Sequence, residues 1–175
     1  MTAWESLSLD DAVKLMIGFP APWWIAGGWA IDLHAERVTR EHDDVDIAVL
    51  YDDRRRLRRH VVGWDVEDTD HGLRARRDPG GPWELEFSWA INDGPEWVYA
   101  RDRSIRVPLA DAVLRAPDGT PYERPELVLL MKSGHVPRRE QDEYDFATAL
   151  PLLDVTGRAR LRQWLAPDDP WQAQL

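Results

Sequence analysis

Short apolar stretches alternate with polar ones along the chain, and their spacing changes from that of strands to that of helices towards the C-terminus. Ser8 precedes an amphipathic stretch that ends at Gly18-Phe19-Pro20, a pattern typical of a capped helix. Residues 23–26 form an apolar run suited to a strand, and Gly27-Gly28 separates this run from a helix-like segment at residues 29–37. We therefore expect a strand, a Gly-Gly turn and a helix in this order.

Residues 44–49 alternate polar and apolar and then become continuously apolar, which predicts a half-buried strand whose polar end opens on a site. An Arg-rich helix is expected at residues 52–63. Its charges surround Leu57 on most sides and balance the preceding acids, so we interpret it as a solvated face rather than as a nucleic-acid contact. Further strands are expected at residues 64–67, 73–77 and 83–89.

From Pro125 onward the pattern becomes helical, with segments at residues 126–135, 140–153 and 156–165. The chain is therefore predicted to be α+β, with a mixed, largely antiparallel sheet flanked by helices and a short C-terminal helical segment. No internal repeat and no Ser/Gly linker divides the 175 residues, so we expect one compact unit.

The composition narrows the possible chemistry. The chain has no cysteine, which excludes disulfides and thiolate metal sites and favours a hard cation such as magnesium. The net charge of −10 argues against a large nucleic-acid footprint and suits a small or cationic partner, although an acidic surface also serves solubility. Because the chain has neither an 18-residue apolar stretch nor a leader-like N-terminus, we expect a cytoplasmic protein without membrane contact. Most of the ten Trp are expected in the core.

Asp44 and Asp46 stand two residues apart in the predicted strand, so their carboxylates should point to the same face. Two like charges at that distance repel unless a cation joins them, and magnesium prefers a few carboxylates together with waters and phosphates. Gly27-Gly28 offers backbone N–H groups at a helix N-terminus, with no side chain to keep a triphosphate away. Each feature is common alone, but their combination in this order is a specific signal.

These segments resemble the nucleotidyltransferase superfamily of the DNA polymerase β type, in particular the small lincosamide and aminoglycoside 2″ antibiotic nucleotidyltransferases. That family carries a GGW-x-x-D segment, read here as residues 27–32, and a TREH-x-D-[IV]-D-[IL] segment, read here as residues 39–47. A later Lys and a KD-x-x-D-like helix are matched by Lys132 and residues 139–145, with Gln141 where the family usually has Lys. The likeness covers residues 23–153. It implies a catalytic domain at residues 1–122 with a helical segment at residues 123–175 packed on it.

Carried over to this chain, the resemblance implies a set of site residues. Magnesium, or manganese, is bound by Asp44 and Asp46, the nucleotide phosphates contact Gly27 and Gly28, Arg40 and His42 border the site, and Lys132 contacts the triphosphate. A third acid on a neighbouring strand acts as metal ligand or as base. Glu84 and Glu86 share a strand face, and we expect Glu86 to fill this role because Glu84 lies nearer a turn and should be wetter.

Simpler interpretations remain open for several of these residues. Arg40 could pair with Glu36 or Glu41 on the surface, and His42 could occupy a capped loop position. The glutamates of the third-acid strand could be exposed to solvent alone. Asp43 is expected to be solvated, and Asp32 to hold the loop that contains Arg40.

The resemblance implies an enzyme that moves a nucleoside monophosphate from an NTP, with ATP as the expected donor, to a hydroxyl of a small molecule. The acceptor would be an aminoglycoside or a lincosamide, and the enzyme a monomer or homodimer. A nucleotidyltransferase that modifies protein or tRNA and a non-catalytic nucleotide-binding relative are the alternatives. A Trp-rich loop at residues 89–97 could stack on an acceptor, with Asp93 and Glu96 attracting a cationic sugar.

Overall fold

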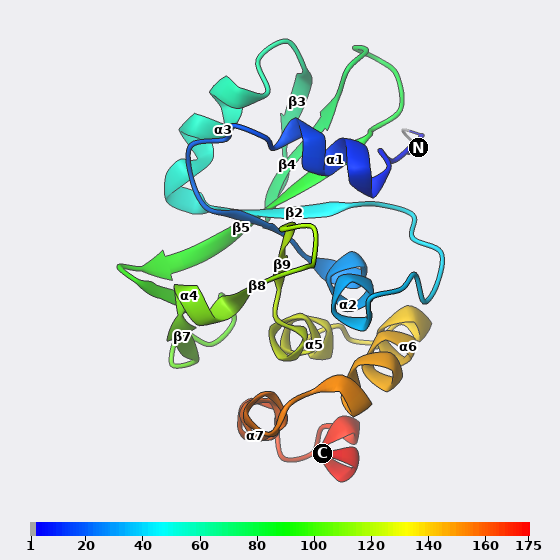
Figure 1. The fold of residues 1–175 in the computed structure, drawn as a ribbon, viewed down its shortest axis with the longest axis vertical. Coiled ribbons are helices and arrows are strands. Elements are labelled where there is room, and N and C mark those ends of the chain that lie inside the picture. The colour runs from blue at the N-terminus through cyan, green and yellow to red at the C-terminus, as the bar shows by residue number, and fades with distance from the viewer. Residues whose placement is uncertain (1–2) are drawn as a thin grey trace.

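The computed structural model describes residues 3–175 and contains helices on both sides of one sheet (Figure 1). The helices are α1 Leu9–Leu15, α2 Gly27–Ala35, α3 Arg54–His60, α4 Leu109–Ala112, α5 Pro125–Ser133, α6 Glu140–Ala149 and α7 Val155–Trp164. The strands are β1 Trp23–Ile25, β2 Asp46–Leu50, β3 Asp65–Asp68, β4 Gly72–Arg76, β5 Leu85–Asp93, β6 Glu96–Val98, β7 Arg106–Pro108, β8 Val113–Arg115 and β9 Pro121–Glu123. Short 3-10 turns span Tyr51–Asp53, Leu150–Leu152 and Pro170–Gln174.

The sheet follows the order β3-β4-β5-β2-β1-β9-β8, with β6 and β7 continuing from β5. Two pairings, β2 with β5 and β1 with β9, are parallel, and the others are antiparallel. This confirms the predicted α+β class with a mixed, largely antiparallel sheet. Because β1 runs antiparallel to β2, the end of β1 and the start of β2 meet at the same edge.

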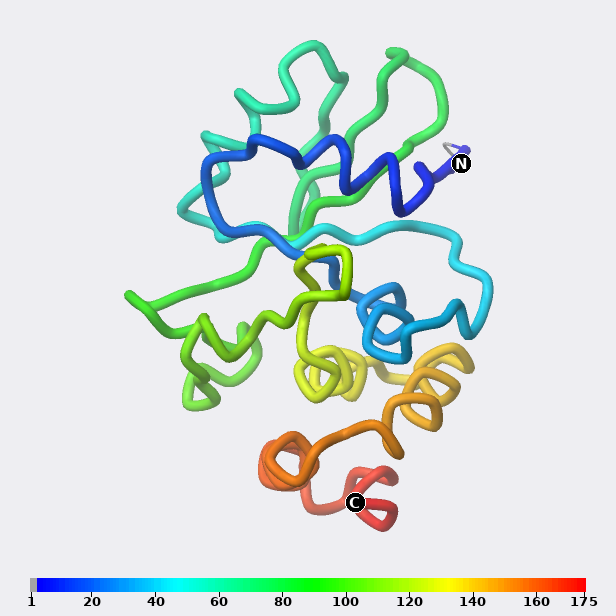
Figure 2. Tube along the Cα trace, in the orientation of Figure 1, coloured from blue at the N-terminus to red at the C-terminus, as the bar shows by residue number. Residues whose placement is uncertain are grey.

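The helices form two layers. In Figure 1, α1 and α3 lie on one side of the central strands, and α2, α5 and α6 lie on the other. In the first layer, His60 of α3 contacts α1, because its Nε2 donates to the carbonyl of Leu15 over 2.7 Å. In the second, α2 contacts both α5 and α6. Figure 2 shows the chain passing from the α1 end of the molecule to the turn after α7 at the opposite end.

Local signals explain where several elements begin. The side chain of Ser8 accepts a hydrogen bond from the amide of Asp11 and caps α1 as predicted. Helix α2 begins at Gly27 itself, so the Gly-Gly pair forms the first turn of the helix rather than a turn before it. Strand β2 begins at Asp46, and Asp44 precedes it.

The prediction of a Trp-rich loop at residues 89–97 is wrong. Strand β5 continues to Asp93 and pairs with β6 in a tight hairpin, with Ile91 opposite Val98. Most of the Trp side chains pack in or against the core, as expected: Trp24, Trp83, Trp97 and Trp171 are buried, and Trp23, Trp29, Trp64, Trp89 and Trp164 pack against the core in part. Within residues 3–175, every helix is too short or too polar to cross a bilayer.

Candidate active site

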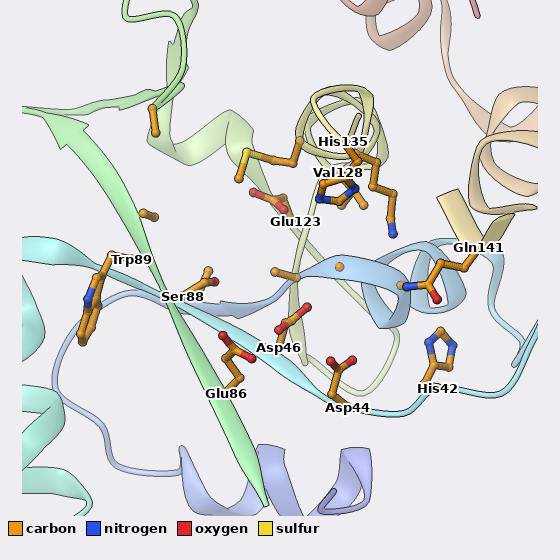
Figure 3. A pocket seen from close by; sticks show the side chains of 18 of the residues that line it. His42, Asp44, Asp46, Glu86, Ser88, Trp89, Glu123, Val128, His135 and Gln141 are labelled. Atoms are coloured by element: carbon orange, nitrogen blue, oxygen red, sulfur yellow. The ribbon is translucent and has the colours of Figure 1, made fainter. Parts of the chain in front are cut away.

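A cavity of about 360 Å³ opens at the edge of the sheet where β1 ends and β2 begins. Its floor is made by side chains of β2, β5 and β9, and α5 and the start of α6 form the opposite wall (Figure 3). The residues that the resemblance implies for catalysis, metal binding and nucleotide binding all line this cavity: Gly27, Gly28, Arg40, His42, Asp44, Asp46, Glu86 and Lys132. Residues separated by about a hundred positions in the sequence are thus brought together.

Three carboxylates gather on the sheet side of the cavity. Asp46 lies directly beside Glu86 in the parallel pairing of β2 with β5, so both side chains emerge on the same face. Asp44 precedes the strand and faces the same space in Figure 3. Burial and the charges of Asp44 and Glu86 raise the pKa of Asp46 to about 7. Burial and the charge of Asp44 also raise the pKa of Glu86.

The raised pKa values mean that the ionised forms of Asp46 and Glu86 are disfavoured, first by burial and then by neighbouring negative charge, and a bound cation would relieve the repulsion. Their oxygens are hard ligands, and magnesium in phosphoryl-transfer sites takes one or two protein carboxylates and completes its shell with waters and phosphates. Within residues 3–175, no three acidic or imidazole groups already converge as a complete metal centre. The Asp44–Asp46 pair fits a magnesium ion of the partly protein-bound kind.

The Gly27-Gly28 pair, which forms the first turn of α2, lies next to the Asp46 side chain. Gly27 has a φ of +62°, and a Cβ at this position would come within 2.6 Å of Asp46 Oδ2. A Cβ on Gly28 would meet the His42 ring at 2.8 Å, and the Arg40 guanidinium as well. Glycine is therefore required at both positions, and the first amides of α2 stay accessible to a ligand.

The loop between α2 and β2 is fixed by Asp32, as the sequence suggested. Buried Asp32 accepts hydrogen bonds from Thr39 Oγ1 and, over 2.6 Å, from His42 Nε2. The His42 ring also stacks on Trp29, with ring centroids 4.3 Å apart. These contacts hold His42 against the first turn of α2, at the rim of the cavity.

Arg40 and Lys132 are held by acids of α6. Arg40 makes a two-point contact with Asp145, with Nε and Nη2 at 2.8 and 2.9 Å from the carboxylate oxygens. Arg40 therefore forms its ion pair with Asp145 rather than with Glu36 or Glu41, and it donates to Glu41 at the backbone carbonyl. Lys132 is 5% exposed, and its Nζ lies 3.0 Å from Asp142 and 2.9 Å from Asp145. Asp142 and Asp145 thus hold the charged groups of Arg40 and Lys132, which come from distant segments, on the same wall of the cavity.

Sequence reasoning missed two further basic side chains on this wall. His135 Nδ1 donates to Asp142 over 2.8 Å, and Arg139 reaches the same carboxylate with Nε and Nη2, each at 3.0 Å. Burial opposes ionisation of Asp142, yet hydrogen bonds from Arg139, His135 and Lys132 hold its pKa far below the usual range. The sequence indicated that residues 139–145 form an acidic helix, but it did not indicate which basic side chains would contact these acids.

The structure separates Glu84 from Glu86. Glu84 precedes β5, lies outside the cavity, and accepts hydrogen bonds from the backbone and side-chain nitrogens of Arg77. The expectation that Glu84 would be the wetter of the two is wrong, because Glu84 is buried and Glu86 is only partly covered. Glu86 lines the cavity beside Asp46.

The other acids suggested by the sequence are elsewhere. Asp93 and Glu96 flank the hairpin turn and contact Arg106, with Nη1 at 2.7 and 3.4 Å, so neither lines the cavity. Trp89 does line it, together with Trp97. Asp43 is exposed at the rim of the cavity.

Comparison with known proteins supports the architecture. A family model described as aminoglycoside-2″-adenylyltransferase matches residues 8–77. Curated 2″-aminoglycoside nucleotidyltransferases of Escherichia coli and Klebsiella pneumoniae are 35% identical over 83 residues, which covers 43% of this chain and 47% of each relative. The matched stretch thus spans about half the length of these relatives.

Solved structures match over most of the chain. The antibiotic-resistance factor ANT(2″)-Ia in complex with adenylyl-2″-tobramycin aligns with a TM-score of 0.65 and 19% identity, covering 89% of this chain and 94% of that one. The lincomycin-bound lincosamide adenylyltransferase LnuA aligns with a TM-score of 0.63 and 18% identity, covering 85% and 100%. At these identities the likeness establishes the fold, and this chain therefore has the fold of these nucleotidyltransferases.

Proposed function

We propose that this protein transfers a nucleoside monophosphate, AMP from ATP in the first instance, to a hydroxyl of a small antibiotic-like molecule and releases pyrophosphate. One observation carries the proposal: Asp44, Asp46 and Glu86 line the same cavity as the open amides of Gly27 and Gly28. The likeness to 2″-aminoglycoside nucleotidyltransferases supports an aminoglycoside as the acceptor.

The two walls of the cavity have opposite charge, and each suits one substrate. The amides of Gly27 and Gly28 would receive the triphosphate, and Arg40, Lys132 and Arg139 would supply positive charge to its oxygens. Arg40 and Lys132 are held in place by buried Asp142 and Asp145, so little ordering is left to do when the nucleotide binds.

Asp44 and Asp46 would hold a magnesium or manganese ion, with Glu86 as a third ligand or as the base. Bound there, the cation would neutralise charge on the triphosphate and on the leaving pyrophosphate. The acceptor oxygen would bond to the α-phosphorus while the bond from that phosphorus to the bridging oxygen breaks, and pyrophosphate would leave with the electron pair. The acceptor proton would pass to Glu86, or to solvent if Glu86 serves as ligand.

A pyrophosphate-release assay tests this function. The four NTPs would be supplied with magnesium and, in turn, with tobramycin, lincomycin or glycerol, and the product mass would be measured. We expect nucleotide-dependent release with at least one antibiotic and a product heavier by one nucleoside monophosphate. Asp46→Asn should abolish it. Asp52→Asn, an exposed acid beyond the far end of the same strand, is the matched control and should not.

A further inference from the structure

Glu123 is a further acid of the cavity, and the proposed chemistry does not use it. Ile25 pairs with Ile47 on one side and with Tyr122 on the other. The next residues along, Asp46, Ala26 and Glu123, therefore continue one row across β2, β1 and β9, and Glu86 extends this row on β5. Neighbours in such a row point to the same face of a sheet. Figure 3 shows the Glu123 carboxylate between this row and α5.

Within residues 3–175, no cation pairs with the Glu123 carboxylate and no side chain donates to it with ordinary hydrogen-bond geometry, although Glu123 is only 7% exposed. The indole Nε1 of Trp24 lies close to it, but this nitrogen also has no partner within the described part of the chain. Other buried acids differ: Glu126 contacts Arg124 and Arg160, and Asp142 contacts Lys132. A buried carboxylate without a pairing cation is unfavourable, so a carboxyl that lacks one and lines a cavity is suited to a cationic ligand.

The position of Glu123 restricts what that ligand can be. A triphosphate is excluded by charge, and the cations that suit it lie on the opposite wall. A single carboxylate is a poor magnesium site, because magnesium needs several oxygen ligands. The neighbouring lining residues Ala26, Val128 and Met131 are apolar. One carboxylate among apolar side chains fits an ammonium group carried on a carbon skeleton.

We propose that Glu123 forms an amine subsite, where it pairs with an ammonium group of the acceptor and selects cationic acceptors over neutral ones. This inference rests on the proposed function, since it assumes that the acceptor enters this cavity. Ala26 leaves the space between Glu123 and Asp46 free of side-chain bulk, so an amine at Glu123 would hold a hydroxyl of the same molecule towards the row of acids.

Binding is measured by calorimetry with tobramycin, lincomycin and 2-deoxystreptamine as probes, with magnesium and a non-hydrolysable ATP analogue present. Glu123→Gln keeps the shape and removes the carboxyl group, which would ionise on pairing with an ammonium group. We expect it to weaken binding of a cationic probe about tenfold to a hundredfold, as for the loss of a charge-assisted hydrogen bond. The affinity for the ATP analogue should stay within about twofold, and Glu84→Gln, outside the cavity, should bind the probes like the wild type.

Two results would overturn the inference: failure of all three probes to bind the wild-type protein, or equal probe affinity of wild type and Glu123→Gln, including the case in which the variant needs more magnesium. That case would assign Glu123 to the metal. Because binding is measured without turnover, a protein that binds tobramycin through Glu123 but releases no pyrophosphate would refute the proposed function and leave the amine subsite standing.

Discussion

Glu86 and Glu84 stand two residues apart, yet they have different surroundings. The Glu86 carboxylate faces the cavity beside Asp46, whereas the Glu84 carboxylate accepts a hydrogen bond from Arg77. If Glu86 accepts the acceptor proton, Glu86→Gln should lower kcat on the order of a hundredfold and leave the KM for NTP nearly unchanged. Glu84→Gln is the matched control and should retain most of the activity. A greater loss of kcat in the Glu84 variant would transfer the role to that residue.

Glu123 predicts a pH dependence of stability. Burial raises its pKa to about 8, the charges of Asp46 and Glu126 act in the same direction, and the Trp24 indole opposes them. Because the pKa is higher in the folded than in the unfolded state, this contribution is fully present below the unfolded pKa near 4.5 and is lost as the pH rises through 8.

Between pH 5 and pH 8 the effect of Glu123 on unfolding free energy should be about 3 kcal/mol. Urea unfolding of wild type and Glu123→Gln across this range measures it. The variant should lose less stability on going to pH 8, and the remaining loss would include that of Asp46, whose pKa is also raised. Parallel pH curves for the two proteins would show that Glu123 ionises normally.

At the scale of elements, α5 and α6 act as one unit through Lys132, which contacts Asp142 and Asp145 of α6. Lys132→Ala should raise the KM for NTP more than it changes the affinity for the acceptor, because one charge near the triphosphate is lost. It should also destabilise the protein by about 3 kcal/mol, since two buried carboxylates each lose a cation. Lys132→Met, which keeps the aliphatic volume, separates charge from packing. Equal weakening of both substrates would contradict the role.

Local patterns predicted the elements that carry their own signals. Ser8 marked the first cap, and the strand before Gly27-Gly28 and the helix after it were both expected. Strands β6 to β9 have three residues each, too short for any alternation to be visible. The hairpin after β5 was therefore interpreted as a loop whose Asp93 and Glu96 could attract a cationic sugar, whereas both contact Arg106.

The residues of the candidate site also fall into two groups, those that the local sequence predicts and those that it does not. Asp44 and Asp46 could be found because their spacing alone places them together. The pairing of Asp46 with Glu86 depends on strand register between segments forty residues apart, and the proximity of Glu123 depends on β9, which the pattern did not reveal. Long-range register follows from the packing of the whole sheet and leaves no local trace.

At the scale of the whole molecule, a net charge of −10 draws cations to the surface without selecting among them, so a magnesium site must be told apart from this general effect. Burial raises the pKa of Asp46 most, and the charges of Asp44 and Glu86 raise it further, so these carboxylates repel one another. Magnesium at this pair should raise the melting temperature as well as support turnover, because it binds only the folded arrangement.

EDTA should therefore abolish pyrophosphate release, and added magnesium or manganese should restore it. The melting temperature should rise with millimolar magnesium in the wild type and stay unchanged in Asp44→Asn and Asp46→Asn, each of which should be as stable as the metal-free wild type or slightly more so. Sodium chloride at the same ionic strength is the control for screening of the overall charge. Turnover in excess chelator would refute the metal mechanism. An equal magnesium shift in all three proteins would refute the assignment of the ion to Asp44 and Asp46.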